Sequence, residues 1–152
     1  MKAVKKILFP VDLSEVSSKI VPWVHNVVEK YDAEVHLLFV ARTFQYYSYG
    51  YVDPRSIVSI EGELIKGGQK KMENFANTYF AEYPACKTQV VLGDPVDEIL
   101  NYISKEGIDL VTMGTHGRKG LKHVLLGSVA DRVIKMSPVP VLTINPYRVL
   151  DL

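Results

Sequence analysis

The stretch Ile108-Asp109-Leu110-Val111-Thr112-Met113-Gly114-Thr115-His116-Gly117-Arg118-Lys119-Gly120 joins an apolar run to a glycine-rich loop. The loop continues to Gly127-Ser128, and residues 129–136 then follow the pattern of a short amphipathic helix. Glycine lets the backbone adopt positive φ and lets a ligand approach the bare main chain. The amides that open the following helix would present a partial positive charge to the same loop. The unit therefore predicts an anion site, with phosphate as its natural guest.

The glycines also have a simpler interpretation. Gly114 and Gly117 could be ordinary turn glycines, and Gly127 could terminate a helix. Three glycines beside Ser128, His116 and several cationic side chains favour the phosphate site over this alternative.

Five short apolar runs alternate with helical patterns along the chain, which predicts a βαβ series. The runs cover residues 6–11, 34–40, 88–92, 108–113 and 139–144. Near-continuous hydrophobicity in the second, fourth and fifth runs predicts strands covered on both faces, as in a parallel sheet between helical layers. The chain of 152 residues is long enough for one core, so we expect residues 1–152 to form a single α/β domain.

The predicted helices carry recognisable boundary signals. Asp94-Pro95 supplies a cap and a proline at the first helical position, and Gly107 ends the same helix. Residues 128–131 have the spacing of a capping box with Ser128 as the cap. Residues 17–31 predict a helix with Pro22 near its first turn, and residues 56–83 predict a long helix that Gly67-Gly68 would break or bend.

Composition narrows the possible partners. A formal net charge of +1 gives no general attraction to nucleic acid or to a membrane surface. The single cysteine, Cys86, excludes an internal disulfide. No signal peptide is visible, and no run approaches the roughly 18 apolar residues of a membrane span. We expect a cytoplasmic protein that binds neither nucleic acid nor membrane.

Residues 42–55 form an unusual connection, with five aromatic side chains between Phe44 and Tyr51. Gly50 and Pro54 argue against regular structure in this segment. Long connections of this kind are often lids or binding surfaces, so residues 44–51 could contact a protein partner. Alternatively, the rings pack against the edge of their own domain.

A ligand site is expected where the strands end, because open α/β sheets bind ligands outside the carboxyl ends of their strands. Asp12 follows the first run, and the glycine loop follows the fourth. If these two runs are neighbours in the sheet, Asp12 faces the glycines. A carboxylate there suits a ribose hydroxyl or a magnesium ion, although an aspartate after a strand is commonly a turn or cap residue.

Several familiar motifs are absent from the sequence. There is no Gly-x-Gly-x-x-Gly of a dinucleotide site and no Walker loop. There is no Gly-x-Ser-x-Gly elbow and no His-Glu-x-x-His zinc motif. No partner is placed to tune His116 as a general base, so we expect it to donate a hydrogen bond to phosphate.

The arrangement Gly114-x2-Gly117-x9-Gly127-Ser128 resembles the ATP-binding motif of the universal stress protein family. The resemblance extends over almost the whole chain. Residues 7–15 resemble the opening strand and turn of that family, and residues 35–40 resemble its second strand. Gly93-Asp94-Pro95 resembles its third junction, and residues 138–142 resemble its last strand.

The resemblance implies a Rossmann-like open sheet of five parallel strands in the order 3-2-1-4-5, with about four helices in layers on both faces. It also implies a site for an adenine nucleotide, ATP or alternatively ADP or AMP. The carboxylate of Asp12 makes magnesium a further candidate. The implied nucleotide-binding residues are Pro10, Val11, Asp12, Val40, Met113, Gly114, His116, Gly117, Arg118, Gly127, Ser128 and Val129. Residues 42–55 depart from the family pattern.

The sequence favours a binding protein over a catalyst, because no base or nucleophile accompanies the phosphate loop. The leading hypothesis is a nucleotide-dependent switch or sensor in the stress response. The alternative is a slow ATPase or nucleotidyl-transfer enzyme that uses Asp12 to hold magnesium. Family members commonly dimerise through the last strand, and residues 139–144 are apolar enough to predict a homodimer there, with Pro140 limiting how that strand pairs.

Overall fold

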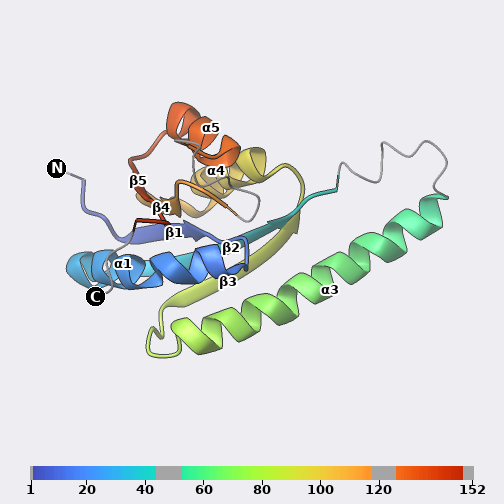
Figure 1. Ribbon diagram of the computed structural model, residues 1–152, viewed down its shortest axis with the longest axis horizontal. Helices are drawn as coiled ribbons and strands as arrows, with labels where there is room; N and C mark the ends of the chain where they lie inside the picture. Colours follow the sequence, from blue (N-terminus) through green and yellow to red (C-terminus); the bar gives the residue numbers. More distant parts are fainter. Residues whose placement is uncertain (1, 44–52, 118–125, 149–152) are drawn as a thin grey trace.

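The computed structural model describes residues 2–43, 53–117 and 126–148. Its strands form one five-stranded parallel sheet in the order β3-β2-β1-β4-β5, which confirms the predicted order (Figure 1). The strands are β1 (Lys6–Pro10), β2 (Glu34–Ala41), β3 (Cys86–Leu92), β4 (Leu110–Gly114) and β5 (Val141–Ile144). The first and fourth runs are therefore neighbours, as a site between them requires.

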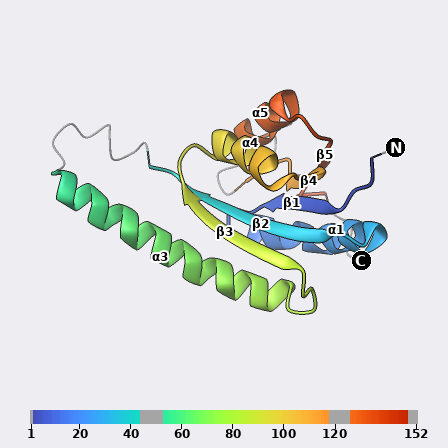
Figure 2. The ribbon, with the colours of Figure 1, turned by 180° about the vertical axis from the view of Figure 1, so that it is seen from behind.

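Four helices cover the sheet within the described residues, two on each face. They are α1 (Glu15–Tyr31), α3 (Pro54–Tyr79), α4 (Pro95–Glu106) and α5 (Ser128–Met136). Figures 1 and 2 show α1 and α3 on one face and α4 and α5 on the other. None of these described helices is long and apolar enough to span a membrane.

The core consists of two apolar clusters, one on each face of the sheet. Ile7 and Phe9 of β1 pack in the first cluster with α1 and α3, whereas Leu8 packs in the second cluster with α4 and α5. This alternation follows from the strand geometry, since successive side chains point to opposite faces. Burial on both faces explains why the central strands have near-continuous apolar sequences.

The fifth apolar run differs from its prediction. β5 begins at Val141 rather than Val139 and lies at the edge of the sheet, where Leu142 is exposed. An edge strand has a neighbour on one side only, so an apolar sequence there does not ensure burial on both faces.

Two predictions about α1 need correction. The helix begins at Glu15 rather than Ser17, with the side chain of Ser14 accepting the amide of Val16 at the cap. Pro22 consequently lies inside the helix rather than near its first turn. The helix is nevertheless continuous from Glu15 to Tyr31, because its buried valines and isoleucine hold it against the sheet.

Helix α3 also differs from its prediction. It begins at Pro54, capped by Asp53, although Pro54 had indicated irregular structure. Proline is well suited to the first turn of a helix because its missing N–H would have no partner there. The helix ends at Tyr79 and runs unbroken through Gly67-Gly68. In Figure 1 its amino-terminal half extends well beyond the sheet.

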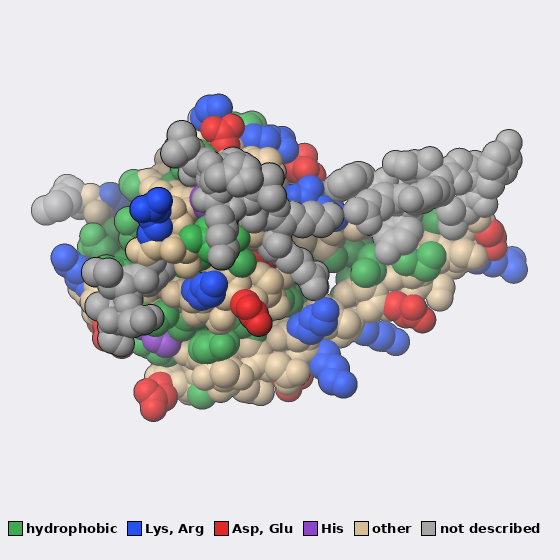
Figure 3. Space-filling view, viewed as in Figure 1, with side chains coloured by type: hydrophobic (Ala, Val, Ile, Leu, Met, Phe, Trp, Pro, Cys, Tyr) green, Lys and Arg blue, Asp and Glu red, His purple; other side chains and the backbone are tan. Residues whose placement is uncertain are grey.

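The surface shows no segregation of charge on the face in view. In Figure 3, acidic and basic side chains are interspersed over this face, including the length of α3. This distribution agrees with the formal net charge of +1.

The signals at α4 are confirmed. Asp94 accepts the amides of Val96 and Asp97, each at 3.1 Å, and Pro95 is the first helical residue. Gly107 ends the helix in the left-handed conformation at φ 66°. Because these signals are local, they could be recognised without knowledge of the tertiary structure.

Candidate functional site

The turn between β1 and α1 is organised around Asp12. Its Oδ1 accepts the amide of Ser14 at 3.0 Å, the hydroxyl of Ser14 at 2.6 Å and the hydroxyl of Ser17 at 2.7 Å. The amide of Asp12 donates to Ser17 Oγ at 3.0 Å. Asp12 is therefore a turn residue, as the simpler interpretation expected, but these bonds use only one of its two carboxylate oxygens.

The second oxygen of Asp12 has a different environment. Oδ2 is buried and has no hydrogen-bond partner within the described residues. Leaving a buried acceptor unpaired costs about 1–3 kcal/mol. A Cβ built on Gly117 would lie 3.3 Å from Oδ2, so the oxygen faces the glycine loop beyond the ends of the paired strands β1 and β4.

Strain in the same turn supports a functional role. Leu13 adopts φ 60°, one of two described non-glycine residues with positive φ. This conformation is uncommon for a branched side chain and costs on the order of 1 kcal/mol. The three Oδ1 bonds of Asp12 on one side and the packing of Leu13 against the core on the other hold the turn in this shape.

The glycines of the loop are required for close approach rather than for positive φ. Among the described glycines, only Gly93 and Gly107 have positive φ, which corrects this part of the sequence interpretation. A Cβ on Gly114 would lie 3.0 Å from the carbonyl oxygen of His116, and a Cβ on Gly127 would lie 2.9 Å from that of Thr115. A side chain at either position would crowd a backbone carbonyl, because the loop backbone packs closely against itself.

Thr115 connects the two ends of the loop. Its carbonyl accepts the amide of Gly127 at 2.6 Å, and its own amide donates to the carbonyl of Ile144 at 2.9 Å. The start of α5 is thereby held beside the end of β4, although the sequence separates them by a long loop. Nothing in the local sequence around Thr115 predicts these bonds, since both partners lie far from it in the chain.

The start of α5 differs from the predicted capping box. Gly127, not Ser128, is the N-cap, and no side chain caps the helix. Gly127 is therefore not a helix terminator either. Ser128 is instead the first helical residue and is exposed. The first amides of a helix have no partner within the helix, so this end of α5 offers donors and a partial positive charge beside Thr115 and His116.

The remaining predicted residues lie at the same end of the sheet. Pro10 ends β1 opposite Leu38, so β2 continues past β1 through Val40. The amide of Val11 donates to the carbonyl of Leu38, and by the alternation of a strand the main-chain groups of Val40 point to the same side. The side chains of Val11 and Met113 are buried in the core, so only their main chains could contact a ligand.

Comparison with known proteins agrees with this fold. The model of the universal stress protein family matches residues 3–145. Universal stress protein MJ0531 of Methanocaldococcus jannaschii is 35% identical, over 93% of this chain and 82% of that protein. Universal stress protein YxiE of Bacillus subtilis is 31% identical, over 92% and 98% respectively. The structure of MJ0577 superposes with a TM-score of 0.84 at 32% identity, over 99% of this chain and 100% of that one.

The chain belongs to the universal stress protein family.

More distant family members share the fold and include nucleotide complexes. A universal stress protein family protein from Arabidopsis thaliana was solved with AMP bound, with a TM-score of 0.64 at 19% identity, over 93% of this chain and 91% of that one. Another universal stress protein was solved in complex with cAMP, with a TM-score of 0.59 at 18% identity, over 95% and 99%. Adenine nucleotides are thus ligands of some proteins with this fold.

Within this universal stress protein, His116 is more enclosed than expected. Its side chain is buried, and Nδ1 lies 2.8 Å from the hydroxyl of Thr115. The imidazole ring packs 5.4 Å from the ring of Tyr147, which in turn lies 5.6 Å from the ammonium of Lys19. The sequence did not suggest these contacts, because Tyr147 and Lys19 lie far from His116 in the chain. Contact between His116 and phosphate stays a prediction.

Other predictions fall outside the described residues. Arg118 and the aromatic residues 44–51 belong to this group. Within the residues that are described, no three His, Cys, Asp or Glu side chains lie close enough together to hold a metal ion. Magnesium binding therefore stays a prediction that involves Asp12 alone among the described carboxylates of the site.

Proposed function

We propose that this universal stress protein binds an adenine nucleotide at the carboxyl ends of β1 and β4 and acts as a nucleotide-dependent switch or sensor in the stress response. The observation that carries the proposal is the buried Oδ2 of Asp12, which has no hydrogen-bond partner within the described residues and faces the bare main chain of Gly117. ATP is the first candidate, with ADP and AMP as alternatives. Complexes of related proteins with AMP and cAMP support the adenine nucleotide class.

The proposed roles follow from the chemistry of the groups. Asp12 accepts a hydrogen bond from a hydroxyl of the ribose, because an ionised carboxylate needs a partner that donates. Gly127, Ser128 and Val129 hold the phosphates through the first amides of α5. The main chain at Val40 reads the adenine edge, and Pro10, Val11 and the backbone of Met113 and Gly114 line the adenosine. His116, Gly117 and Arg118 complete the contacts with the phosphates.

Binding of ATP, ADP and AMP to the purified protein, measured by isothermal titration calorimetry with and without magnesium, tests the proposal. We expect binding to the wild-type chain and its loss in Gly127→Val, whose side chain would collide with the carbonyl of Thr115. Gly62→Val is the matched control because a Cβ at Gly62 meets nothing within 4 Å. Absence of binding by all three nucleotides would reject the proposal.

A second titration tests the role of Asp12 separately. We expect the wild-type chain to bind ATP about 10-fold or more tightly than 2′,3′-dideoxy-ATP, since a hydrogen bond to a charged group is worth about 1.5–3 kcal/mol. Asp12→Asn should remove most of this preference. Comparing two ligands on one variant separates the ribose contact from any effect of the substitution on the turn. An undiminished preference in Asp12→Asn would contradict the assignment.

The same oxygen of Asp12 favours a second candidate function, slow ATP hydrolysis or nucleotidyl transfer with magnesium. In that case ADP or AMP would be released steadily, and Asp12→Ala would abolish the release while nucleotide binding survived. If ATP remained intact for hours in the presence of the protein and magnesium, the enzyme hypothesis would be rejected and the nucleotide-dependent switch would stand.

We further propose that the protein forms a homodimer through β5. The carbonyl of Pro140 accepts a hydrogen bond from the amide of Val111, and that of Ile144 accepts one from the amide of Thr115. Because main-chain groups alternate along a strand, those of Val141 and Thr143 point away from β4, toward the outer edge of β5. Pro140 faces β4 and does not obstruct that edge. A protein partner at residues 44–51 and a cytoplasmic location stay predictions, and the latter is checked by fractionating cells.

A further inference from the structure

The outer edge of β3 offers unpaired main-chain groups. The sheet order places β3 at an edge, and the amide of Gly93 donates to the carbonyl of Ala41 in β2 at 3.0 Å. Because main-chain groups alternate along a strand, those of Thr88, Val90 and Leu92 point away from β2. Within the described residues these groups have no hydrogen-bond partner.

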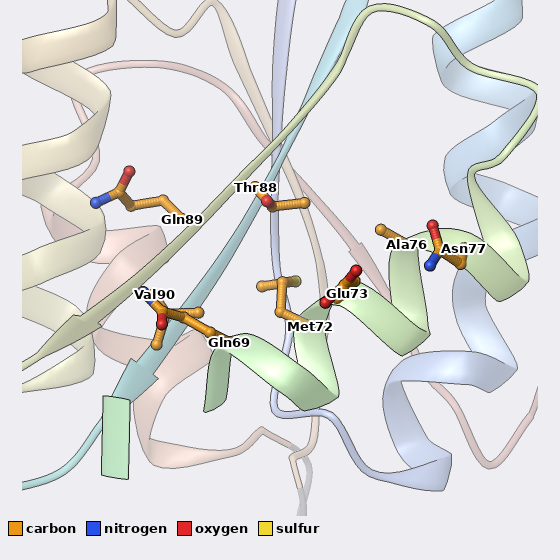
Figure 4. A pocket seen from close by; sticks show the side chains of 8 residues that line it. All are labelled: Gln69, Met72, Glu73, Ala76, Asn77, Thr88, Gln89 and Val90. Atoms are coloured by element: carbon orange, nitrogen blue, oxygen red, sulfur yellow. The ribbon is translucent and has the colours of Figure 1, made fainter. Parts of the chain in front are cut away.

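A cavity of about 450 Å³ lies along this edge, between β3 and α3 (Figure 4). Thr88, Gln89 and Val90 all line it. Consecutive side chains of a strand point to opposite faces of the sheet, so three consecutive lining residues mean that the cavity reaches the edge of β3 and not only one face.

The α3 side of the cavity combines an apolar floor with a polar rim. Met72 and Ala76 lie beside Val90 in the cavity wall, and all three pack in or against the core cluster beneath it. Gln69, Glu73 and Asn77 form the rim on α3. Glu73 is the one charged residue that lines the cavity within the described chain.

Common protection of a sheet edge is missing from this part of β3. Proteins protect exposed edges with proline, bulges or charged side chains that discourage a further strand. The stretch from Thr88 to Val90 contains no proline and no charge and pairs with β2 in continuous register. Lys87, just before it, is engaged in an ion pair with Glu34 at 2.9 Å.

We propose that the edge of β3 binds an extended polypeptide segment of a partner protein as a sixth strand. A row of alternating amides and carbonyls on every second residue is complementary to another extended main chain, and not to a helix or a nucleic acid. A small apolar side chain of the segment lies over Met72 and Val90, and a basic side chain lies beside Glu73. This surface is separate from the glycine loop, so the inference does not depend on nucleotide binding.

The test uses a panel of short acetylated peptides that alternate valine with lysine or serine and differ in the central residue. Binding to the isotope-labelled protein, without nucleotide, is followed by the NMR shifts of its amides. We expect at least one peptide to shift the amides of Thr88, Val90 and Leu92. Two further versions of that peptide carry N-methyl groups on one or the other alternate set of amides. One version should bind about 10-fold more weakly or worse, and the other like the parent.

Thr88→Pro removes the outward amide of β3 without removing a bond to β2, and edge strands tolerate proline at such positions. It should abolish peptide binding, whereas Thr88→Val, which keeps the amide, should not. Gln69→Trp fills the cavity from α3 and should also abolish binding, which keeps the test decisive if Thr88→Pro fails to fold. No binding across the panel, or equal binding by both methylated versions, would overturn the proposal.

Discussion

His36 lies in the middle of β2 with a fully buried side chain, in a network that joins three elements. Its Nε2 contacts the carboxylate of Glu34, and its Nδ1 lies 2.8 Å from the hydroxyl of Tyr102 on α4. A carboxylate can only accept, so Nε2 carries the proton and Tyr102 donates to Nδ1. The neutral imidazole thus satisfies both of its nitrogens, and Lys87 neutralises the charge of Glu34 at 2.9 Å.

This network predicts a dependence of stability on pH. Burial lowers the pKa of His36 below its ordinary value of 6.5, although the hydrogen bond with Glu34 opposes the change. The unfolded chain therefore takes up a proton at higher pH than the folded chain does. The contribution of the neutral His36 to stability is complete above pH 6.5 and declines as the pH falls below that value.

We expect the free energy of unfolding to fall between about pH 7.5 and about pH 5.5. His36→Gln should be less stable at the higher pH but should lose less on acidification, because it has no imidazole to protonate. Urea denaturation of both proteins at the two pH values provides the measurement. Because the two proteins differ only at position 36, equal losses would contradict the assignment to His36.

At the scale of the element, α3 shows how packing decides the effect of a glycine. Gly67 and Gly68 are adjacent in a continuous helix, yet their surroundings differ. A Cβ on Gly67 meets nothing within 4 Å, whereas a Cβ on Gly68 would lie 3.0 Å from Val90 and 3.1 Å from Phe39. Gly68 therefore lets α3 approach β2 and β3 closely, and this contact keeps the helix intact through the glycine pair.

The two positions should respond in opposite directions to alanine. Gly67→Ala should raise the free energy of unfolding by about 0.5–1 kcal/mol, because alanine loses less backbone entropy in a helix. Gly68→Ala should lower it by about 1–3 kcal/mol through overpacking against the sheet. Urea denaturation distinguishes these outcomes, and a change of the same sign in both variants would be inconsistent with the packing described.

The two caps provide a second prediction at this scale. Asp94 caps α4 through two amides, whereas the side chain of Ser128 caps nothing at α5. Asp94→Ala should therefore cost about 0.5–2 kcal/mol, and Ser128→Ala should change stability little in the absence of nucleotide. Thermal unfolding of both variants checks the difference. If Ser128→Ala lowered the stability as much as Asp94→Ala, Ser128 would have to cap α5, in contradiction to the structure.

At the scale of the whole molecule, the parallel sheet has three separate surfaces at its carboxyl end and its two edges. Its carboxyl end carries Asp12 and the glycine loop, and the β3 edge carries the cavity beside α3. Among the described strands, β5 has a neighbour on one side only. An open sheet has two edge strands, and in this protein they are β3 and β5. The fold thus places the three proposed sites, for a nucleotide, a peptide and a second copy of the chain, apart from one another.

The dimer proposal predicts a specific change in mass. Leu142→Asp on β5 should convert the dimer to a monomer, because the proposed interface would bury the new charge. Val58→Asp on α3 is the matched control, since Val58 is 70% exposed against 40% for Leu142. The amino-terminal half of α3, which contains residue 58, lies far from β5 in Figure 1. Sedimentation velocity measures both. A wild-type monomer, or dissociation by Val58→Asp as well, would contradict the β5 interface.

Local patterns in the sequence determined the elements of this protein and their boundaries at caps such as Asp94 and Gly107. The order of the strands followed from the resemblance to the family and was confirmed by the sheet. These features are encoded by residues close together in the chain, where periodicity and capping act, so they can be recognised without a structure.

Only the tertiary structure decided which oxygen of Asp12 is unpaired, why a side chain would be crowded at Gly114, Gly127 and Gly68, and that β3 has a cavity along its edge. Each of these depends on contacts between residues far apart in the sequence. Such distances arise when helices and strands pack against one another, and no local pattern specifies them. The sequence therefore determined the elements and the candidate residues, while packing decided what each residue touches.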